Sequence, residues 1–381
     1  MTINRKAFLH CASMFLLLAV VSPSFAIYCT FTEKPAWNPK SIRSIMEKVA
    51  NWQLNEWKLN GNKYPKWDWT NAAGYKGLFE LAKISKSKIW YKYLLSVGNE
   101  LDWNTGSNRF YADDYCIGQT YANLYEKYKD EKMIAKFRLL AESIIAQPHT
   151  GSLEWKNNIN HREWAWCDAL FMGPPSLAYL ATATGEMKYF DIMDKLWWKT
   201  YDYLYDKTEH LFFRDGSNFA RKEKNEKKVF WSMGNGWVMA GLVRVLDNLP
   251  ADYLGREKYV TLFNEMAEKL ASIQQPDGSW HTSLLDPASY PFKETSGTGF
   301  NTYALVWDIN NKILEKAKYG SVTEKAWNSL ITAIQPNGRL GYVQLIGWKP
   351  EPASPNSTEI FCVSAFLITG SEMFKYSKII R

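Results

Sequence analysis

Histidine and cysteine are scarce in this chain. Its 381 residues contain five of each, and the cysteines are far apart, with no Cys-x-x-Cys pair. Zinc sites in proteins use closely spaced cysteine and histidine ligands, so a metal site of this kind is not expected. A Ser-His-Asp triad is also not favoured, because the chain contains few histidines.

Motifs that bind nucleotides or activate a serine are also missing. The sequence contains no P-loop, no Gly-x-Gly-x-x-Gly, no His-Glu-x-x-His and no Gly-x-Ser-x-Gly. These absences argue against P-loop NTPases, dinucleotide-binding folds, zinc proteases and α/β-hydrolases. Carboxylates therefore remain as the candidate catalytic groups.

A sustained basic stripe is lacking, although the formal net charge is +7. The densest basic run, residues 221–228, is interrupted by Glu223 and Glu226. Nucleic-acid-binding surfaces cluster their lysines and arginines, so we expect no nucleic-acid partner. A modest positive balance is compatible with an acidic substrate.

Long apolar runs are confined to the first 26 residues. Arg5 and Lys6 precede an apolar run over residues 8–21, and residues 24–26 form a small-x-small sequence. This order is typical of a secretory signal peptide, so we expect cleavage after residue 26 and export to the periplasm. Lipidation of Cys29 is not favoured, because the three residues before it are a poor lipoprotein box. Since no other stretch approaches about 20 apolar residues, no membrane span is expected.

Aromatic residues, by contrast, are abundant. The chain has 18 tryptophans and 22 tyrosines. Rings at this density suit a cleft that stacks on sugar rings, and they equally suit a tryptophan-rich core. Composition alone leaves both interpretations open.

Helical periodicity dominates the sequence after the leader. Apolar residues recur at i, i+4, i+7 and i+11, as in Ile117, Tyr121, Leu124 and Tyr128. We expect helices near residues 40–58, 71–84, 87–101, 113–129, 131–146, 163–183, 187–204, 231–248, 256–274, 296–313, 321–335 and 357–378.

Twelve helices with alternating short and long loops predict six helical hairpins. A closed ring of six hairpins buries every apolar stripe, so an all-α (α/α)6 barrel is predicted. An open α-solenoid is the alternative, but the hairpins share no repeat of fixed period. Short strands are expected at 211–213 and 279–282, and no linker tract interrupts a single domain over residues 27–381.

Asp168 is the first candidate catalytic residue. It lies in the stretch WAWCDALFMGPP, residues 164–175, among tryptophans and other apolar residues. Burial disfavours the charged form of a carboxyl group and raises its pKa, so a proton can be held near neutral pH and then donated. The alternative is an aspartate that caps a helix or pairs with Arg162.

Asp113 and Asp114 are the next candidates, at the expected start of a helix. One aspartate is enough for an N-cap, so the other can face a cleft, although capping explains both equally well. The stretch WSMGNGW, residues 231–237, also opens a helix, and its glycines allow a ligand to approach the backbone. The alternative for this stretch is a tight turn.

Together these stretches resemble glycoside hydrolase family 105, the unsaturated rhamnogalacturonyl hydrolases, and more loosely the unsaturated glucuronyl hydrolases. The matching segments span residues 60–320: Trp67-Asp68-Trp69, ADDYCIGQTYANLYE, WAWCDALFMGPP, FWSMGNGW and DGSWHTSLLDPASYPFKETSGTG. The resemblance implies an (α/α)6 barrel. It also implies hydration of the C4=C5 double bond of the terminal unsaturated uronic acid in polysaccharide-lyase products.

The resemblance further assigns roles to individual residues. Asp168 is the acid that protonates C4 and the base that activates water, and Asp113 is the second carboxylate. The expected substrate-binding residues are Trp69, Asp114, Trp164, Trp166, Arg214, Trp231, Asn235, Trp237 and His281. The expected partner is an acidic unsaturated oligosaccharide, and no cofactor is implied, because proton transfer and water addition need only carboxylates.

The chain departs from the family pattern at two positions. Met233 stands where the family usually has arginine, and Asn158 stands where it has lysine. Binding of the uronate carboxylate would then fall to Arg214, Arg221 or His281. Glucuronyl-rhamnose products of sulfated algal polysaccharides therefore stay open as alternative substrates, beside the pectic products. A non-catalytic glycan-binding barrel, a conventional glycosidase and a sugar epimerase on the same fold also stay open.

Overall fold

The computed structural model describes residues 37–154 and 164–379, which lie in one compact unit. The predicted signal peptide and Cys29, Asn158 and Arg162 lie outside the described residues. Among the described residues, no helix combines the length and the apolarity needed to cross a bilayer.

Helices account for most of the described chain. They are α1 Pro39–Asn60, α2 Trp69–Ile84, α3 Ile89–Glu100, α4 Gly118–Tyr128, α5 Lys132–Ala146, α7 Ala169–Met172, α8 Pro174–Thr184, α9 Lys188–Leu204, α10 Ser232–Asn248, α11 Arg256–Ser272, α12 Thr295–Asn310, α13 Lys316–Thr332 and α14 Ile360–Ile379. Short 3-10 helices lie at η1 Ala112–Tyr115, η3 Gly216–Asn218 and η4 Pro287–Ser289.

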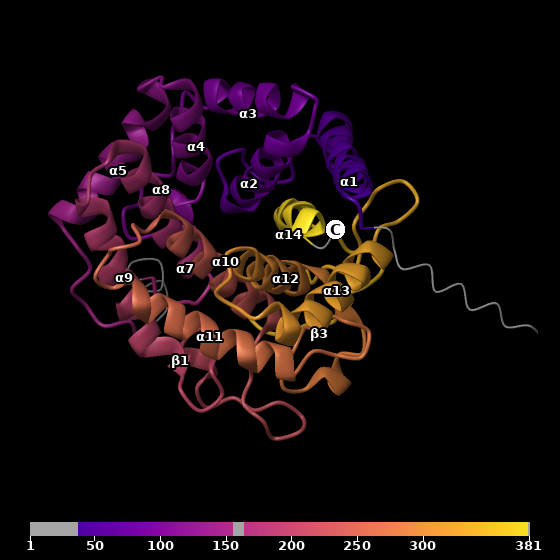
Figure 1. Cartoon of the computed structure of the whole chain (residues 1–381). Helices are drawn as coiled ribbons and strands as arrows, with labels where there is room; N and C mark the ends of the chain where they lie inside the picture. Colours follow the sequence, from indigo (N-terminus) through magenta and orange to yellow (C-terminus); the bar gives the residue numbers. More distant parts are fainter. Residues whose placement is uncertain (1–36, 155–163, 380–381) are drawn as a thin grey trace, which may run out of the picture. The chain divides into compact units, whose positions relative to one another are not determined.

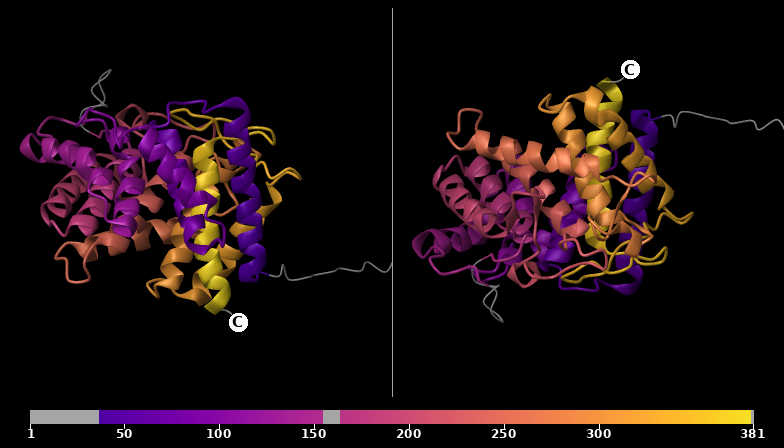
Figure 2. Two further views of the ribbon diagram at one scale, coloured as in Figure 1. Left: turned by 90° about the horizontal axis from the view of Figure 1, so that it is seen from above. Right: turned by 90° about the horizontal axis from the view of Figure 1, so that it is seen from below.

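The helices form two concentric rings (Figure 1). In the inner ring α2, α4, α8, α10, α12 and α14 each contact the next, and α14 contacts α2, which closes the circle. Outer helices pack against inner partners, as in the pairs α4–α5, α8–α9, α10–α11 and α12–α13. Figure 2 shows α14 beside α1, where the two ends of the described chain meet. The predicted (α/α)6 barrel is confirmed.

The burial of each helix follows from its sequence. The outer helix α1 buries one stripe that contains Ile42, Met46, Val49, Gln53 and Trp57. That spacing is the period of an amphipathic helix. Nearly all residues of the inner helices α10, α12 and α14 are buried, because neighbours surround these helices on every side.

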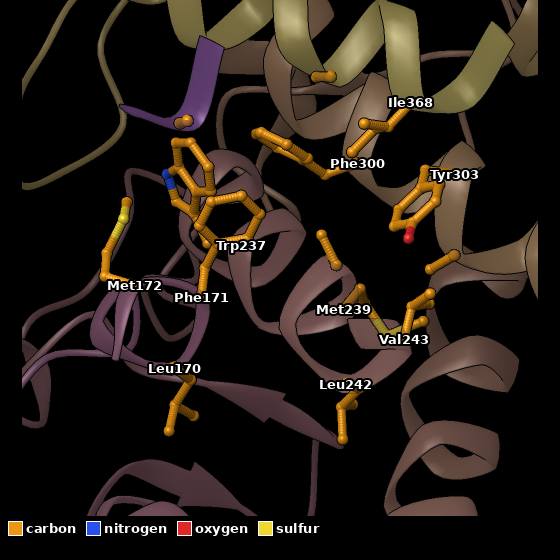
Figure 3. Close-up of a cluster of buried hydrophobic side chains, with 14 of the residues drawn as sticks. Leu170, Phe171, Met172, Trp237, Met239, Leu242, Val243, Phe300, Tyr303 and Ile368 are labelled. Carbon is orange, nitrogen blue, oxygen red and sulfur yellow. The ribbon is translucent and has the colours of Figure 1, made fainter. Parts of the chain in front are cut away.

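The inner helix α10 approaches the short helix α7 closely where its side chains are small. Gly241 of α10 is an example: a Cβ added there would lie 2.3 Å from the carbonyl oxygen of Leu170. Around this contact, side chains from α7, α10, α12 and α14 form one apolar cluster (Figure 3). The core of the barrel is therefore continuous with the segment that follows Asp168.

Two predicted helices are interrupted. The segment 113–129 consists mainly of η1 and α4. The described part of the segment 163–183, from residue 164, has an irregular start followed by α7 and α8. Pro174 lacks an N–H and occupies the first turn of α8, so Gly173 separates α8 from α7. α13 begins at Lys316, earlier than predicted.

Two short hairpins lie in the loops. β1 Tyr205–Asp206 pairs with β2 Leu211–Phe212, and β3 Trp280–His281 pairs with β4 Lys293–Glu294, both antiparallel. β2 and β3 confirm the predicted strands, although each has only two residues. Cys116, Cys167 and Cys362 are buried and free.

Candidate active site

A cavity of about 240 Å³ opens among the loops that precede the inner helices. Segments far apart in sequence build it, which is typical of sites carried on a rigid scaffold. Its lining residues are Trp69, Tyr111, Asp113, Trp166, Asp168, Met172, Arg214, Trp231, Met233, Trp237, Ile346, Gly347 and Trp348. The structure thus brings together both predicted catalytic aspartates and five of the predicted substrate-binding residues, namely Trp69, Trp166, Arg214, Trp231 and Trp237.

Asp168 is positioned by backbone pairing as well as by packing. The Cys167 N–H donates to the Arg214 carbonyl at 2.8 Å, and Trp166 forms a bridge with Asp215. Directly after Asp168 the chain enters α7, and the Phe171 N–H donates to the Asp168 carbonyl at 3.0 Å. These bonds fix the backbone on both sides of the aspartate.

The surroundings of Asp168 favour its protonated form. The residue is only 8% exposed, and burial raises its pKa to about 6 against the opposing effect of Arg214. Arg214 Nε lies 3.5 Å from Asp168 Oδ2, while its Nη1 donates to Asp215 Oδ2 at 2.8 Å. Asp168 Oδ1 has no hydrogen-bond partner among the described residues. A buried oxygen without a donor gives no support to the charged form, which again favours protonation.

Asp113 is the second titratable carboxyl group of the cavity. Burial raises its pKa to about 7, a hydrogen bond with Tyr111 acts in the opposite direction, and the negative charge of Asp168 raises it further. Asp68, whose side chain caps α2 by accepting the Thr70 N–H at 2.9 Å, also raises it. The two carboxyl groups are thus coupled, and titration of one depends on the charge of the other.

Aromatic rings form the walls. The rings of Trp69 and Trp237 meet edge to face at 6.1 Å, and those of Tyr111 and Trp166 lie 5.8 Å apart. Trp237 also packs on Phe171 of α7 at 4.4 Å. Such walls suit the C–H faces of a sugar and leave orientation to a few polar groups.

Four predicted substrate-binding residues do not line the cavity, and each makes bonds or contacts within the protein. Trp164 is buried against Tyr115, with ring centroids 5.6 Å apart. The other three bond to nearby backbone: Asp114 accepts the Asn108 N–H at 2.7 Å, Asn235 accepts the Phe212 N–H at 2.8 Å, and His281 Nδ1 lies 3.2 Å from the Pro287 carbonyl. These residues hold the loops that carry the site, and their direct contact with substrate stays a prediction.

Among the candidate cations, Arg214 is the one that lines the cavity. Arg221 is exposed, and the Nε2 of His281 lies 3.8 Å from Asp277. Met233, at the position where the family usually has arginine, is buried in the first turn of α10 and contributes an apolar surface. In the described ranges, 37–154 and 164–379, no group of three or more histidine, cysteine or acidic side chains could hold a metal ion.

The loop 345–348 is a part of the site that sequence reasoning missed. Ile346 and Trp348 line the cavity while remaining 44% and 61% exposed. Buried Gln344 anchors the loop: its Oε1 accepts the Trp231 Nε1–H at 2.8 Å, and its Nε2 donates to the Lys349 carbonyl at 2.8 Å. A tryptophan flanked by glycine and lysine in a non-helical stretch was the available signal. Tyr111 and Met172 also line the cavity, and their only signal in the sequence was their proximity to the aspartates.

Comparisons with known proteins show which family this chain belongs to. The family model of Glycosyl Hydrolase Family 88 matches residues 42–377. An unsaturated 3S-rhamnoglycuronyl hydrolase of Formosa agariphila is 40% identical over 321 residues, 81% of this chain and 84% of that protein. One from an Alteromonas species is 31% identical over 89% of this chain and 87% of that protein. A solved structure described as a glycosyl hydrolase family 88 protein from Bacteroides vulgatus is 30% identical, with a TM-score of 0.80 over 89% of this chain and 99% of that chain.

Proposed function

Since the chain belongs to glycosyl hydrolase family 88 and is a glycoside hydrolase of the unsaturated glycuronyl type, we propose that Asp168 is its general acid and base. The observation that carries this proposal is the pair of coupled, protonatable aspartates in an aromatic cavity. The substrate is a polysaccharide-lyase product that ends in a 4,5-unsaturated uronic acid.

The chemistry follows from the electronic character of the double bond. The ring oxygen of the unsaturated sugar donates electron density, so C4 is the carbon that accepts a proton. Protonated Asp168 gives its proton to C4, and a water molecule adds its oxygen to C5. Asp168, now a carboxylate, takes the second proton of that water and is restored. The resulting hemiketal collapses and releases the neighbouring sugar.

Arg214 has two roles in this proposal. Its guanidinium is the cation of the described lining, so it pairs with the C6 carboxylate of the substrate. It also lies beside Asp168 and keeps the pKa of that carboxyl group from rising further. Arg214 thus performs binding that the family usually assigns to the arginine at position 233.

The neighbouring sugar is rhamnose in this proposal. The Formosa and Alteromonas relatives are named for rhamnoglycuronyl substrates, and the cavity rim offers apolar Ile346 and Trp348. Rhamnose carries a methyl group at C6 that suits such a rim. The pectic alternative, an unsaturated rhamnogalacturonyl disaccharide, presents the same methyl group and, because the double bond removes the stereocentre at C4, the same unsaturated uronic acid. It differs in the linkage between the two sugars.

The decisive experiment follows ultraviolet absorbance, because hydration destroys the conjugated C=C–carboxylate chromophore. Purified enzyme is mixed with unsaturated glucuronyl-rhamnose, with and without 3-sulfate, and with the pectic disaccharide. We expect loss of absorbance with the first pair and none with a saturated control. Activity confined to the pectic substrate would contradict the sugar assignment, and no loss with any substrate would contradict the reaction.

We also propose that the enzyme is exported to the periplasm. The basic residues, apolar run and small-x-small sequence of residues 1–26 support this proposal. N-terminal sequencing of the protein from a periplasmic fraction is expected to begin at Ile27. An N-terminus at residue 1 in the cytoplasmic fraction would contradict it.

A further inference from the structure

A second depression lies where the first and last helices of the barrel meet. Its volume is about 580 Å³, more than twice that of the catalytic cavity. We name it the seam groove and define it by Trp52, Glu56, Tyr64, Asn337, Arg339 and Glu359. These residues come from α1, from the loop before α2, and from the segment between α13 and α14. α1 and α14 lie side by side in Figure 1 and Figure 2.

The seam groove offers aromatic rings with polar groups beside them. Trp52 and Tyr64 are half-buried, and the Arg339 guanidinium carbon lies 5.9 Å from the centre of the Trp52 ring. Lys63 Nζ lies 5.0 Å from the centre of the Tyr64 ring. Sugar rings pack their C–H faces on such rings while their hydroxyls bond to neighbouring polar side chains.

The charges of the groove are balanced. Lys63 pairs with buried Glu359. The lining has one further cation, Arg339, and one further acid, Glu56, so the charges sum to zero. Asn60 and Asn337 add amide donors and acceptors. Nucleic acid, with a charge on every nucleotide, gains little from this balance. A chain with a carboxylate on alternate sugars finds donors and acceptors for its hydroxyls and a cation, Arg339, for one carboxylate.

The walls of the groove are held in place before any ligand arrives. Gly338 has φ +98°, and a Cβ there would lie 2.8 Å from the Lys48 carbonyl, so only glycine lets the turn sit against α1. Within this turn the Gln335 N–H donates to the Arg339 carbonyl at 2.8 Å. Across the groove, buried Asn71 donates to the Tyr64 carbonyl at 3.0 Å. Preorganised walls reduce the entropy lost on binding.

The groove and the catalytic cavity are supported by the same elements. Trp69 lines the cavity and Asn71 lines the groove, and both lie in the first turn of α2. Likewise, Ile360 lines the groove, while the next residue, Phe361, stacks on Trp69 with ring centroids 5.6 Å apart. We propose that the seam groove is a second saccharide-binding site, which holds internal sugars of a rhamnose–uronate chain and keeps the enzyme on its substrate.

The test uses a saturated hexasaccharide of alternating rhamnose and uronic acid, which lacks the reactive double bond. Calorimetric titration of the wild type is compared with Trp52→Ala, Arg339→Gln and the matched control Trp67→Ala. Trp67 is an exposed tryptophan that is not among the residues described as lining either depression. We expect about tenfold weaker binding for Trp52→Ala, as for loss of a stacked ring, and unchanged binding for Trp67→Ala.

Two further measurements separate this proposal from the other sources of binding. Disaccharide hydrolysis by Trp52→Ala and Arg339→Gln is expected to match the wild type, which shows that the catalytic cavity is intact. If Trp52→Ala fails to fold, Arg339→Gln carries the comparison alone. Asp168→Asn saturated with unsaturated disaccharide is expected still to bind the hexasaccharide.

Three results would overturn the proposal. The first is equal affinity of the wild type, Trp52→Ala and Arg339→Gln for the hexasaccharide. The second is no binding of the hexasaccharide by the wild type. The third is competition between the disaccharide and the hexasaccharide. Failure of the proposed hydrolytic function would be seen separately, in the absorbance assay.

Discussion

Asp168 and Asp113 show how an apolar environment prepares two ordinary carboxyl groups for chemistry. Burial raises the pKa of Asp168 to about 6 and that of Asp113 to about 7. Each negative charge also opposes the other, so the pair retains a proton into the neutral range. Below about pH 6 the proton needed at C4 is therefore present on Asp168 itself.

Replacement of Asp168 by asparagine removes the transferable proton and keeps the shape of the side chain. We expect kcat on the unsaturated disaccharide to fall about 10²–10⁴-fold, the usual contribution of a general acid or base. Binding, measured by calorimetry with the same disaccharide, should change little. A variant with wild-type kcat would refute the assignment.

Activity of the wild type should fall as pH rises. Protonated Asp168 is the reactive form, and it is lost above its pKa of about 6. We expect kcat/KM to decrease about tenfold per pH unit on the basic side of the profile. A profile that is flat from pH 5 to 9 would contradict this role.

Arg214→Leu should separate binding from acid strength. Loss of a charged hydrogen-bond partner costs about 1.5–3 kcal/mol, so we expect kcat/KM to fall about 10- to 100-fold, mainly through a higher KM. Because Arg214 lowers the pKa of Asp168, the basic limb of the pH profile should move to higher pH. A higher KM with no shift of the limb would show that Arg214 does not act on Asp168.

The raised pKa of Asp168 also predicts an effect on the stability of the protein. The folded pKa of Asp168 is raised from 3.8 to about 6, so the folded state binds more protons than the unfolded state between these values. Stability therefore falls as pH rises through this window, and Asp168→Asn escapes the loss. We expect the variant to gain about 1–3 kcal/mol relative to wild type at pH 8, and less at pH 4, in chemical unfolding. An equal difference at both pH values would contradict the prediction.

At the scale of residues, the sequence predicts which residue types build the site better than it predicts where each side chain points. Asp113, Asp168 and Trp237 combine unusual chemistry with turn-to-helix positions, and the structure places them in one cavity. Asn235 has the same signals, yet its side chain bonds to the backbone of β2. Trp348 reaches the site through a loop whose path depends on the bond between Gln344 and Trp231, 113 residues apart. No local pattern encodes such a contact.

At the scale of elements, the catalytic segment depends on the contact between α7 and α10. Gly241 of α10 lies against the Leu170 carbonyl, two residues after Asp168. Helical periodicity predicted most helices but could not show that Gly173 and Pro174 divide one of them. The division matters because it places a short helix, directly after Asp168, against the middle of α10.

Gly241→Ala should disturb this contact. The added methyl group would lie 2.3 Å from the Leu170 carbonyl, so the helices must separate. We expect a loss of about 1–3 kcal/mol in the free energy of unfolding and a lower kcat. The matched control is Gly320→Ala in α13, where the added Cβ meets its nearest neighbour at 3.4 Å. This control should be neutral or up to about 1 kcal/mol more stable, and equal effects at the two sites would contradict the prediction.

At the scale of the whole molecule, closure of the inner ring depends on α14. This helix contacts α1, α2 and α12, and nearly all its residues are buried. The sequence predicts the ring from the number of hairpins and their loops. It does not predict which surfaces adjoin where the ring closes, and so the seam groove was not foreseen.

Deletion of residues 360–381 should leave the apolar sides of α2 and α12 exposed. We expect the truncated protein to lack a cooperative thermal transition and to be recovered in the insoluble fraction. The control lacks residues 1–26 and should unfold cooperatively, as should the full chain. A soluble truncated protein with a sharp transition would contradict the dependence on α14.

The position of α14 also has a consequence for the timing of folding. α14 follows the other described inner helices in the sequence, so the ring stays open until this helix has docked, however well the earlier hairpins have formed. During that interval the folding chain presents two apolar helix faces, on α2 and α12, that α14 covers in the native state. The incomplete ring is therefore the folding intermediate most prone to association with other chains.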